Sequence, residues 1–172
     1  MIFCIRIYKG GLVLDSKAFD AELRIPSDLA YLRSIRAFVR ELAENLGFDS
    51  DKINDIEIAT DEILSNAVEH GSKDANSEIV IFFVTNEESM EIVVRDYGNG
   101  EPLTDKLSRI LSIIETSNVE NDKERGRGLL LARLLSDDML VESNSAGGLD
   151  VHLVWSFGRD GAYCLKNNSL CY

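Results

Sequence analysis

The chain has 172 residues, with 18 lysines and arginines against 30 aspartates and glutamates, so its formal net charge is −12 at pH 7. Such a charge repels phosphate backbones and anionic bilayers at long range, which argues against nucleic acid or a membrane as a partner. A chain of this length is expected to form one domain with an ordinary buried core.

Cysteine content and apolar segments bear on the cell compartment. Three cysteines are too few, and odd in number, for a disulfide framework. The longest purely apolar run, residues 79–84, is far too short to span a bilayer. The apolar N-terminus contains basic residues and lacks a cleavage pattern, so it is interpreted as a strand rather than a signal peptide. A cytoplasmic protein is therefore expected.

The first half of the chain predicts two short strands followed by two helices. The strands are expected over residues 2–8 and 20–25. Leucine, isoleucine and valine recur at helical spacing over residues 27–46, with Ser27 as the expected N-cap. A second amphipathic helix is expected over residues 50–71.

The second half is richer in strands. The runs 79–85 and 90–96 are joined by turn residues and predict a hairpin. Residues 99–125 are polar, with a short helix expected within them over 104–114, and a third helix is expected from residue 128. Two closing strands follow. Because the strands come as hairpins rather than βαβ units, the pattern favours an α+β fold: a two-layer sandwich with a mixed, mostly antiparallel sheet and helices on one face.

Glu62 and Asn66 are the first candidate site residues. They are four residues apart and so share one face of the second helix. An amide oxygen can bind Mg²⁺ without adding charge that repels phosphates, and a carboxylate can accept a proton from a hydroxyl. The same spacing is also typical of the solvated face of an amphipathic helix.

A glycine-rich turn follows the second strand of the hairpin. It contains Asp96, Gly98 and Gly100, and the glycines allow the backbone to turn sharply and approach a ligand closely. Asp96 could accept a hydrogen bond from an exocyclic amine. The alternative is an ordinary turn in which Asp96 acts as a cap.

A second glycine pair opens the third helix. Gly126 and Gly128 precede Leu129, and Arg125 and Arg127 add positive charge there. Backbone N–H groups at a helix start can hold phosphate. The alternative is a flexible helix start, because neither a Walker loop nor a dinucleotide fingerprint is present.

The order of these motifs resembles the GHKL superfamily of ATP-binding domains. DEILSNAVEHG (61–71) is similar to its N box, and VRDYGNG (94–100) and ERGRGLLLARLLSD (124–137) to its two glycine boxes. The match is closest to bacterial anti-sigma-factor serine/threonine kinases of the partner-switching type. It covers about residues 20–157 and implies a Bergerat-type fold, with residues 1–19 as an N-terminal extension and 158–172 as a tail.

The resemblance implies a role for each motif. Glu62 would be the catalytic base, Asn66 the Mg²⁺ ligand and Asp96 the adenine contact. The glycines at 98, 100, 126 and 128, together with Arg125, Arg127 and Leu129, would form the remainder of the ATP pocket, and residues 101–123 its lid. The implied partners are a sigma factor and its small antagonist protein, whose phosphorylation releases it, and the implied assembly is a homodimer.

One departure from the family pattern keeps an alternative open. Members of the family commonly have Gly-Thr in the last hairpin, whereas here Gly148 is followed by Leu149. A non-catalytic module that binds ATP and sequesters a sigma factor or another regulator is therefore a second hypothesis. A histidine-kinase fragment is disfavoured, because neither histidine lies in an extra dimerisation helix.

Overall fold

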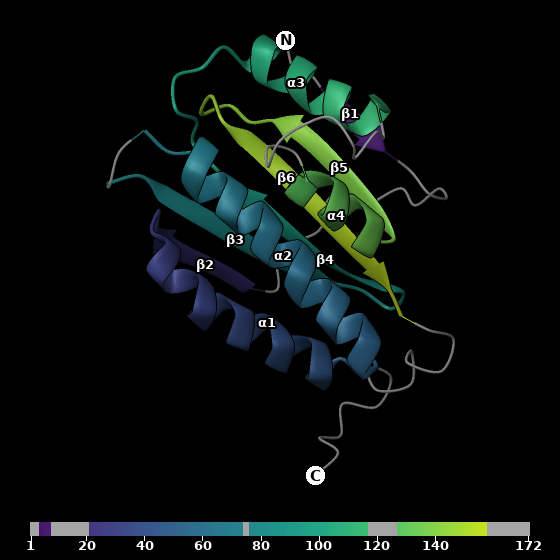
Figure 1. Cartoon of the computed structure of the whole chain (residues 1–172). Helices are drawn as coiled ribbons and strands as arrows, with labels where there is room; N and C mark the ends of the chain where they lie inside the picture. Colours follow the sequence, from purple (N-terminus) through teal and green to yellow (C-terminus); the bar gives the residue numbers. More distant parts are fainter. Residues whose placement is uncertain (1–3, 8–20, 74–75, 117–126, 158–172) are drawn as a thin grey trace.

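A computed structural model describes residues 4–7, 21–73, 76–116 and 127–157 (Figure 1). Its centre is a six-stranded sheet in the order β1-β5-β6-β4-β3-β2. The strands are β1 (Cys4–Ile7), β2 (Ala21–Pro26), β3 (Glu78–Thr85), β4 (Ser89–Arg95), β5 (Asp138–Ser143) and β6 (Leu149–Ser156). All of the described strand pairings are antiparallel. The expected α+β fold with a mostly antiparallel sheet is confirmed.

Helices cover one face of this sheet, which gives the expected two layers. They are the short 3₁₀ helix η1 (Leu29–Tyr31), α1 (Leu32–Asn45), α2 (Ser50–His70), α3 (Leu103–Thr116) and α4 (Arg127–Leu135). Helix α2 packs against α1 on one side and α4 on the other, and α3 lies toward one end of the sheet (Figure 1). The long α2 therefore crosses the centre of the molecule and contacts both β4 and β6.

Alternation along the strands places one set of side chains between the two layers. The fully buried residues of this core include Ile63 and Leu64 on α2 and Phe83, Ile92, Leu153 and Trp155 on the sheet. The indole Nε1 of Trp155 donates a hydrogen bond of 2.9 Å to the carbonyl of Leu135. The last strand is thereby joined to the end of α4.

The first helical segment begins one residue later than the sequence predicts. Asp28, not Ser27, is the N-cap: its carboxylate accepts a hydrogen bond of 2.8 Å from the backbone N–H of Ala30. The hydroxyl of Ser27 instead forms a hydrogen bond with that of Ser72, which joins β2 to the segment after α2. The cap prediction is wrong because a tertiary contact occupies the serine.

The polar segment after β4 contains the helix that the sequence predicts. Helix α3 is longer than the expected 104–114, and Leu107 is buried in the core while Leu103 and Ile110 pack against it. The first part of the expected lid segment therefore contributes to the core. Residues 117–123 lie outside the described residues.

Two further expectations concern the chain ends and the membrane. Residues 4–7 of the expected N-terminal extension form β1, which pairs with β5 at the edge of the sheet. The tail, 158–172, lies outside the described residues. None of the helices in the described ranges has the length and apolar character needed to cross a membrane.

Candidate active site

A cavity of about 280 Å³ lies between α2, α3, the start of α4 and the adjoining ends of β4 and β6. Each of the three sequence motifs contributes a lining residue: Asn66, Asp96 and Leu129. The remaining wall is largely apolar, with Ile63, Ala67, Val94, Ile110, Leu149 and Val151. An apolar cavity with a few polar side chains is typical of small-molecule sites.

Asp96 lines this cavity directly after β4 and is 5% exposed. Its Oδ1 accepts hydrogen bonds from the backbone N–H groups of Gly98 at 2.9 Å and Leu149 at 3.3 Å. Burial raises the pKa of Asp96 above its ordinary value, and the nearby charge of Lys106 and the two N–H groups offset part of that rise. The backbone therefore fixes this carboxylate.

Glycines let the backbone pack closely around Asp96. Gly98 has a φ of +78°, and a Cβ there would lie 2.3 Å from the carbonyl oxygen of Gly147. A Cβ on Gly71 would lie 2.5 Å from the Cβ of Asp96, and one on Gly148 would lie 2.1 Å from its carbonyl oxygen. Gly98 was predicted as a site residue. A role for Gly71 and Gly148 is not predicted from the sequence, because a glycine after a helix or in a hairpin turn is common.

Glu62 and Asn66 project from α2 on neighbouring turns. Asn66 is half-buried and lines the cavity. Glu62 is not part of the cavity lining, and its carboxylate lies against Gly128 at the start of α4. Within the described part of the chain, neither side chain has a hydrogen bond or ion pair. Both are therefore available to a ligand.

The start of α4 faces the same region. Leu129 is 8% exposed and lines the cavity, whereas Arg127, the first residue of α4, is exposed and does not. Arg125 and Gly126 lie outside the described residues. The other predicted glycine, Gly100, has a φ of +91° and belongs to the turn after Asp96.

Two cations from α3 also belong to the site and are not predicted from the sequence. Lys106 and Arg109 both line the cavity, and Lys106 is 5% exposed. The guanidinium of Arg109 forms two hydrogen bonds with Glu101, at 2.5 Å and 3.0 Å, and lowers the pKa of that carboxyl. Their spacing of three residues, which puts two side chains on one helix face, is the signal that could have identified them.

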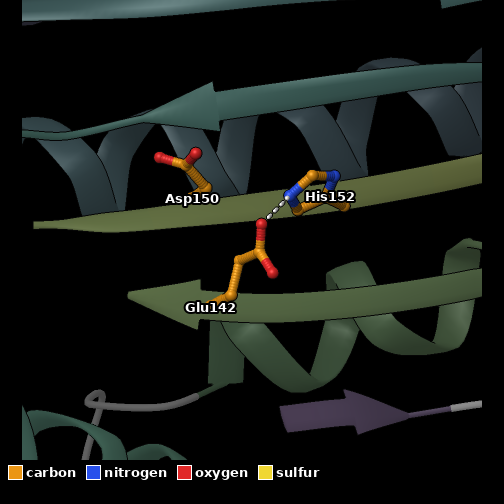
Figure 2. Close-up of side chains that lie close together, drawn as sticks. All are labelled: Glu142, Asp150 and His152. Atoms are coloured by element: carbon orange, nitrogen blue, oxygen red, sulfur yellow. Dashed lines mark ion pairs between the residues drawn. The ribbon is translucent and has the colours of Figure 1, made fainter. Parts of the chain in front are cut away.

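A second cluster of titratable groups lies on strands β5 and β6, where Glu142, Asp150 and His152 approach one another (Figure 2). Asp150 is already held by the guanidinium of Arg95. The Nδ1 of His152 lies 2.7 Å from a carboxylate oxygen of Glu91, and its Nε2 lies 3.4 Å from Glu142. Burial lowers the pKa of His152, but the carboxylates outweigh it and raise the pKa above its ordinary value. The cluster is therefore interpreted as a cross-strand charge network.

Comparison with known proteins adds to this description. A family model described as a histidine kinase-like ATPase domain matches residues 25–155. Serine-protein kinase RsbW of Bacillus velezensis is 31% identical over 125 residues, which is 72% of this chain and 78% of that protein. The protein of the same name from Bacillus licheniformis is 31% identical over 140 residues, or 81% and 86% of the two chains.

A solved structure supports the fold. The RsbU and RsbW domains of a Mycobacterium tuberculosis protein superpose with a TM-score of 0.54 at 24% identity. The match covers 80% of this chain and 33% of that one, so this chain spans about a third of the solved chain's length.

Proposed function

Since the chain belongs to the histidine kinase-like ATPase domain family, we propose that it is a serine/threonine protein kinase that uses Mg²⁺-ATP and acts as an anti-sigma factor in partner switching. The observation that carries this proposal is the convergence of three separate motifs on one cavity, through Asn66, Asp96 and Leu129. The name of the similar Bacillus proteins, serine-protein kinase, supports the same reaction class.

The base of the nucleotide would occupy the part of the cavity that Asp96 lines. There the fixed carboxylate of Asp96 can accept a hydrogen bond from an exocyclic amine, and Val94 and Leu149 provide apolar surface for the ring. The phosphates would then extend toward Asn66 and the start of α4, where backbone N–H groups and the helix dipole favour negative charge.

The residues present fit a magnesium ion carried in with the nucleotide. The amide oxygen of Asn66 is a hard, neutral ligand at the cavity wall and has no competing partner among the described residues. When bound, Mg²⁺ would neutralise charge on the phosphates. Asn66 would hold the ion and would orient the triphosphate relative to α2.

Glu62 would receive the proton of the attacking hydroxyl. Its carboxylate has no competing hydrogen bond in the described part of the chain. From α2 it lies against Gly128 at the start of α4, beside the expected path of the phosphates. Phosphoryl transfer depends mainly on positioning and charge stabilisation. A single oriented general base on α2 would therefore be enough to accept the proton of the hydroxyl.

The proposed phosphate acceptor is a serine or threonine of a small antagonist protein. Phosphorylation would release the antagonist, and the kinase would then be able to hold a sigma factor. The net charge of −12 favours basic protein surfaces as partners. A homodimer in the cytoplasm is part of the same proposal.

The proposal is tested by incubating the chain with γ-labelled ATP, Mg²⁺ and a candidate antagonist encoded by a neighbouring gene. We expect label on one serine or threonine of the antagonist, and none after that residue is replaced by alanine. Binding of ATP without any transfer would contradict the kinase and support the non-catalytic module.

A further inference from the structure

Lys106 places a buried ammonium group beside Asp96. Its Nζ lies 3.4 Å from both carboxylate oxygens of Asp96, and each side chain is only 7% exposed. Oδ1 is also bound by two backbone N–H groups, whereas Lys106 is the partner of Oδ2 within the described residues. Oδ2 is therefore the oxygen that remains available to accept a ligand's hydrogen.

The pair is looser than a purely structural ion pair. A charge-assisted hydrogen bond between an ammonium and a carboxylate is ordinarily about 2.7–2.9 Å long, shorter than the separation here. Burial of a lysine carries a large desolvation cost, and a buried ion pair is weak evidence of stabilisation. The lysine lines the cavity, so its placement is better explained by a ligand than by folding.

Among the described residues, Lys106 is the side chain that donates to the carboxylate of Asp96. The backbone N–H of Leu149 donates to the Asp96 carboxylate and its carbonyl accepts from the Asp96 N–H, but its side chain is apolar and 3% exposed. A base whose amine is bound by Asp96 presents a ring nitrogen directly beside that amine. Against Leu149 this nitrogen would be buried without a donor, which costs affinity.

On the basis of the nucleotide binding proposed above, we propose that Lys106 determines base specificity by donating a hydrogen bond to N1 of adenine while Asp96 accepts one from the 6-amino group. This edge of adenine carries a hydrogen-bond donor, the 6-amino group, beside an acceptor, N1. The carboxylate of Asp96 is an acceptor and the ammonium of Lys106 is a donor, so the pair complements that edge. Guanine in the same position would present an oxygen to Asp96 and an N–H to Lys106. Both contacts would then be repulsive.

The test combines a change in the protein with a change in one base atom. Wild-type chain and Lys106→Met are titrated calorimetrically with ATP and with 1-deaza-ATP, in which N1 is replaced by C–H. We expect the wild type to bind ATP about tenfold or more tightly than the analogue, since hydrogen bonds to charged groups have this magnitude. Lys106→Met should bind both nucleotides with the same, weaker affinity, and Lys106→Gln, which keeps a donor, should restore part of the preference.

Arg109→Met is the matched control, because Arg109 is the other α3 cation of the cavity. It should leave the ratio of the two affinities unchanged.

An equal loss for both nucleotides in Lys106→Met, or tighter ATP binding, would overturn the inference: the lysine would then act on the phosphates or compete for Asp96. If the wild type binds neither nucleotide, the proposed function itself fails. Equal binding of both by the wild type removes only the role of Lys106.

Discussion

The carboxylate of Glu62 on α2 lies so close to Gly128 on α4 that no side chain fits between them: a Cβ on Gly128 would come within 2.2 Å of Glu62 Oε2. The glycine thus lets the proposed catalytic base lie against the start of α4. Gly128, which lies 66 residues further along the chain, leaves room for the Glu62 carboxylate in this position.

Gly128→Ala tests this contact. The nearest atom is the end of a flexible side chain, so Glu62 can rotate away and the fold should survive. Because alanine favours a helix over glycine by about 1 kcal/mol, the melting temperature should stay constant or rise slightly. Phosphoryl transfer should nevertheless fall, since the base is displaced. Thermal unfolding and transfer of label measure the two effects, and a stable variant with full transfer would contradict the positioning role.

Glu62→Gln separates chemistry from binding. The amide keeps the shape of the side chain but cannot accept the proton, so transfer should fall about 10²- to 10⁴-fold. ATP affinity should change little, because the cavity is lined by Asn66, Asp96 and Leu129 and not by Glu62.

Full transfer by Glu62→Gln would remove Glu62 from the mechanism. Asp61 is then a poor substitute, since it is engaged in an ion pair with Arg36 on α1. Glu69, which is exposed near the end of α2, would be the next carboxylate to test.

Asn66→Ala tests the proposed magnesium ligand. The side chain has no partner in the described part of the chain, so the free energy of unfolding should change by less than about 0.5 kcal/mol. Affinity for ATP should fall about tenfold in the presence of Mg²⁺ and much less in EDTA, because one ligand of the ion is lost. Calorimetry with and without Mg²⁺ measures this, and equal losses in both conditions would exclude a metal role.

The sequence predicts the layers of this fold and most helix and strand positions, because apolar periodicity carries that information locally. It also predicts that Asn66 and Asp96 belong to one site, since their motifs have characteristic spacing, and both side chains line the same cavity. Lys106 is not predicted, because a lysine in a polar segment is usually solvated and only tertiary packing buries it here. Gly71 and Gly148 are missed for a similar reason: their function depends on the distance to Asp96, which is not a local property.

Helix α3 should respond to nucleotide. It carries Lys106 into the cavity, so a base bound at Asp96 should hold the helix in place and slow its amide exchange. Hydrogen exchange of residues 103–116 should therefore slow when Mg²⁺-ATP is added, while exchange in α1 stays the same. Equally strong protection of α3 with and without ATP would contradict a lid.

The last prediction concerns stability against pH. The pKa of His152 is raised in the folded chain, so its contribution to stability is fully present below its unfolded pKa of about 6.5. That contribution should be lost as the pH rises through the higher folded pKa. Urea unfolding should accordingly give a lower free energy of unfolding at pH 9 than at pH 6.

Glu91→Gln should alter this dependence in a defined direction. Glu91 contributes the strongest of the interactions that raise the pKa of His152, whereas burial alone lowers it. Without that carboxylate the folded pKa should move down toward or below about 6.5, so the loss of stability between pH 6 and pH 9 should shrink or reverse. Arg24→Gln is a suitable control, because Arg24 pairs with Glu22 on the exposed part of β2 and should keep the wild-type slope. Identical pH profiles for Glu91→Gln and wild type would show that His152 does not govern this pH range.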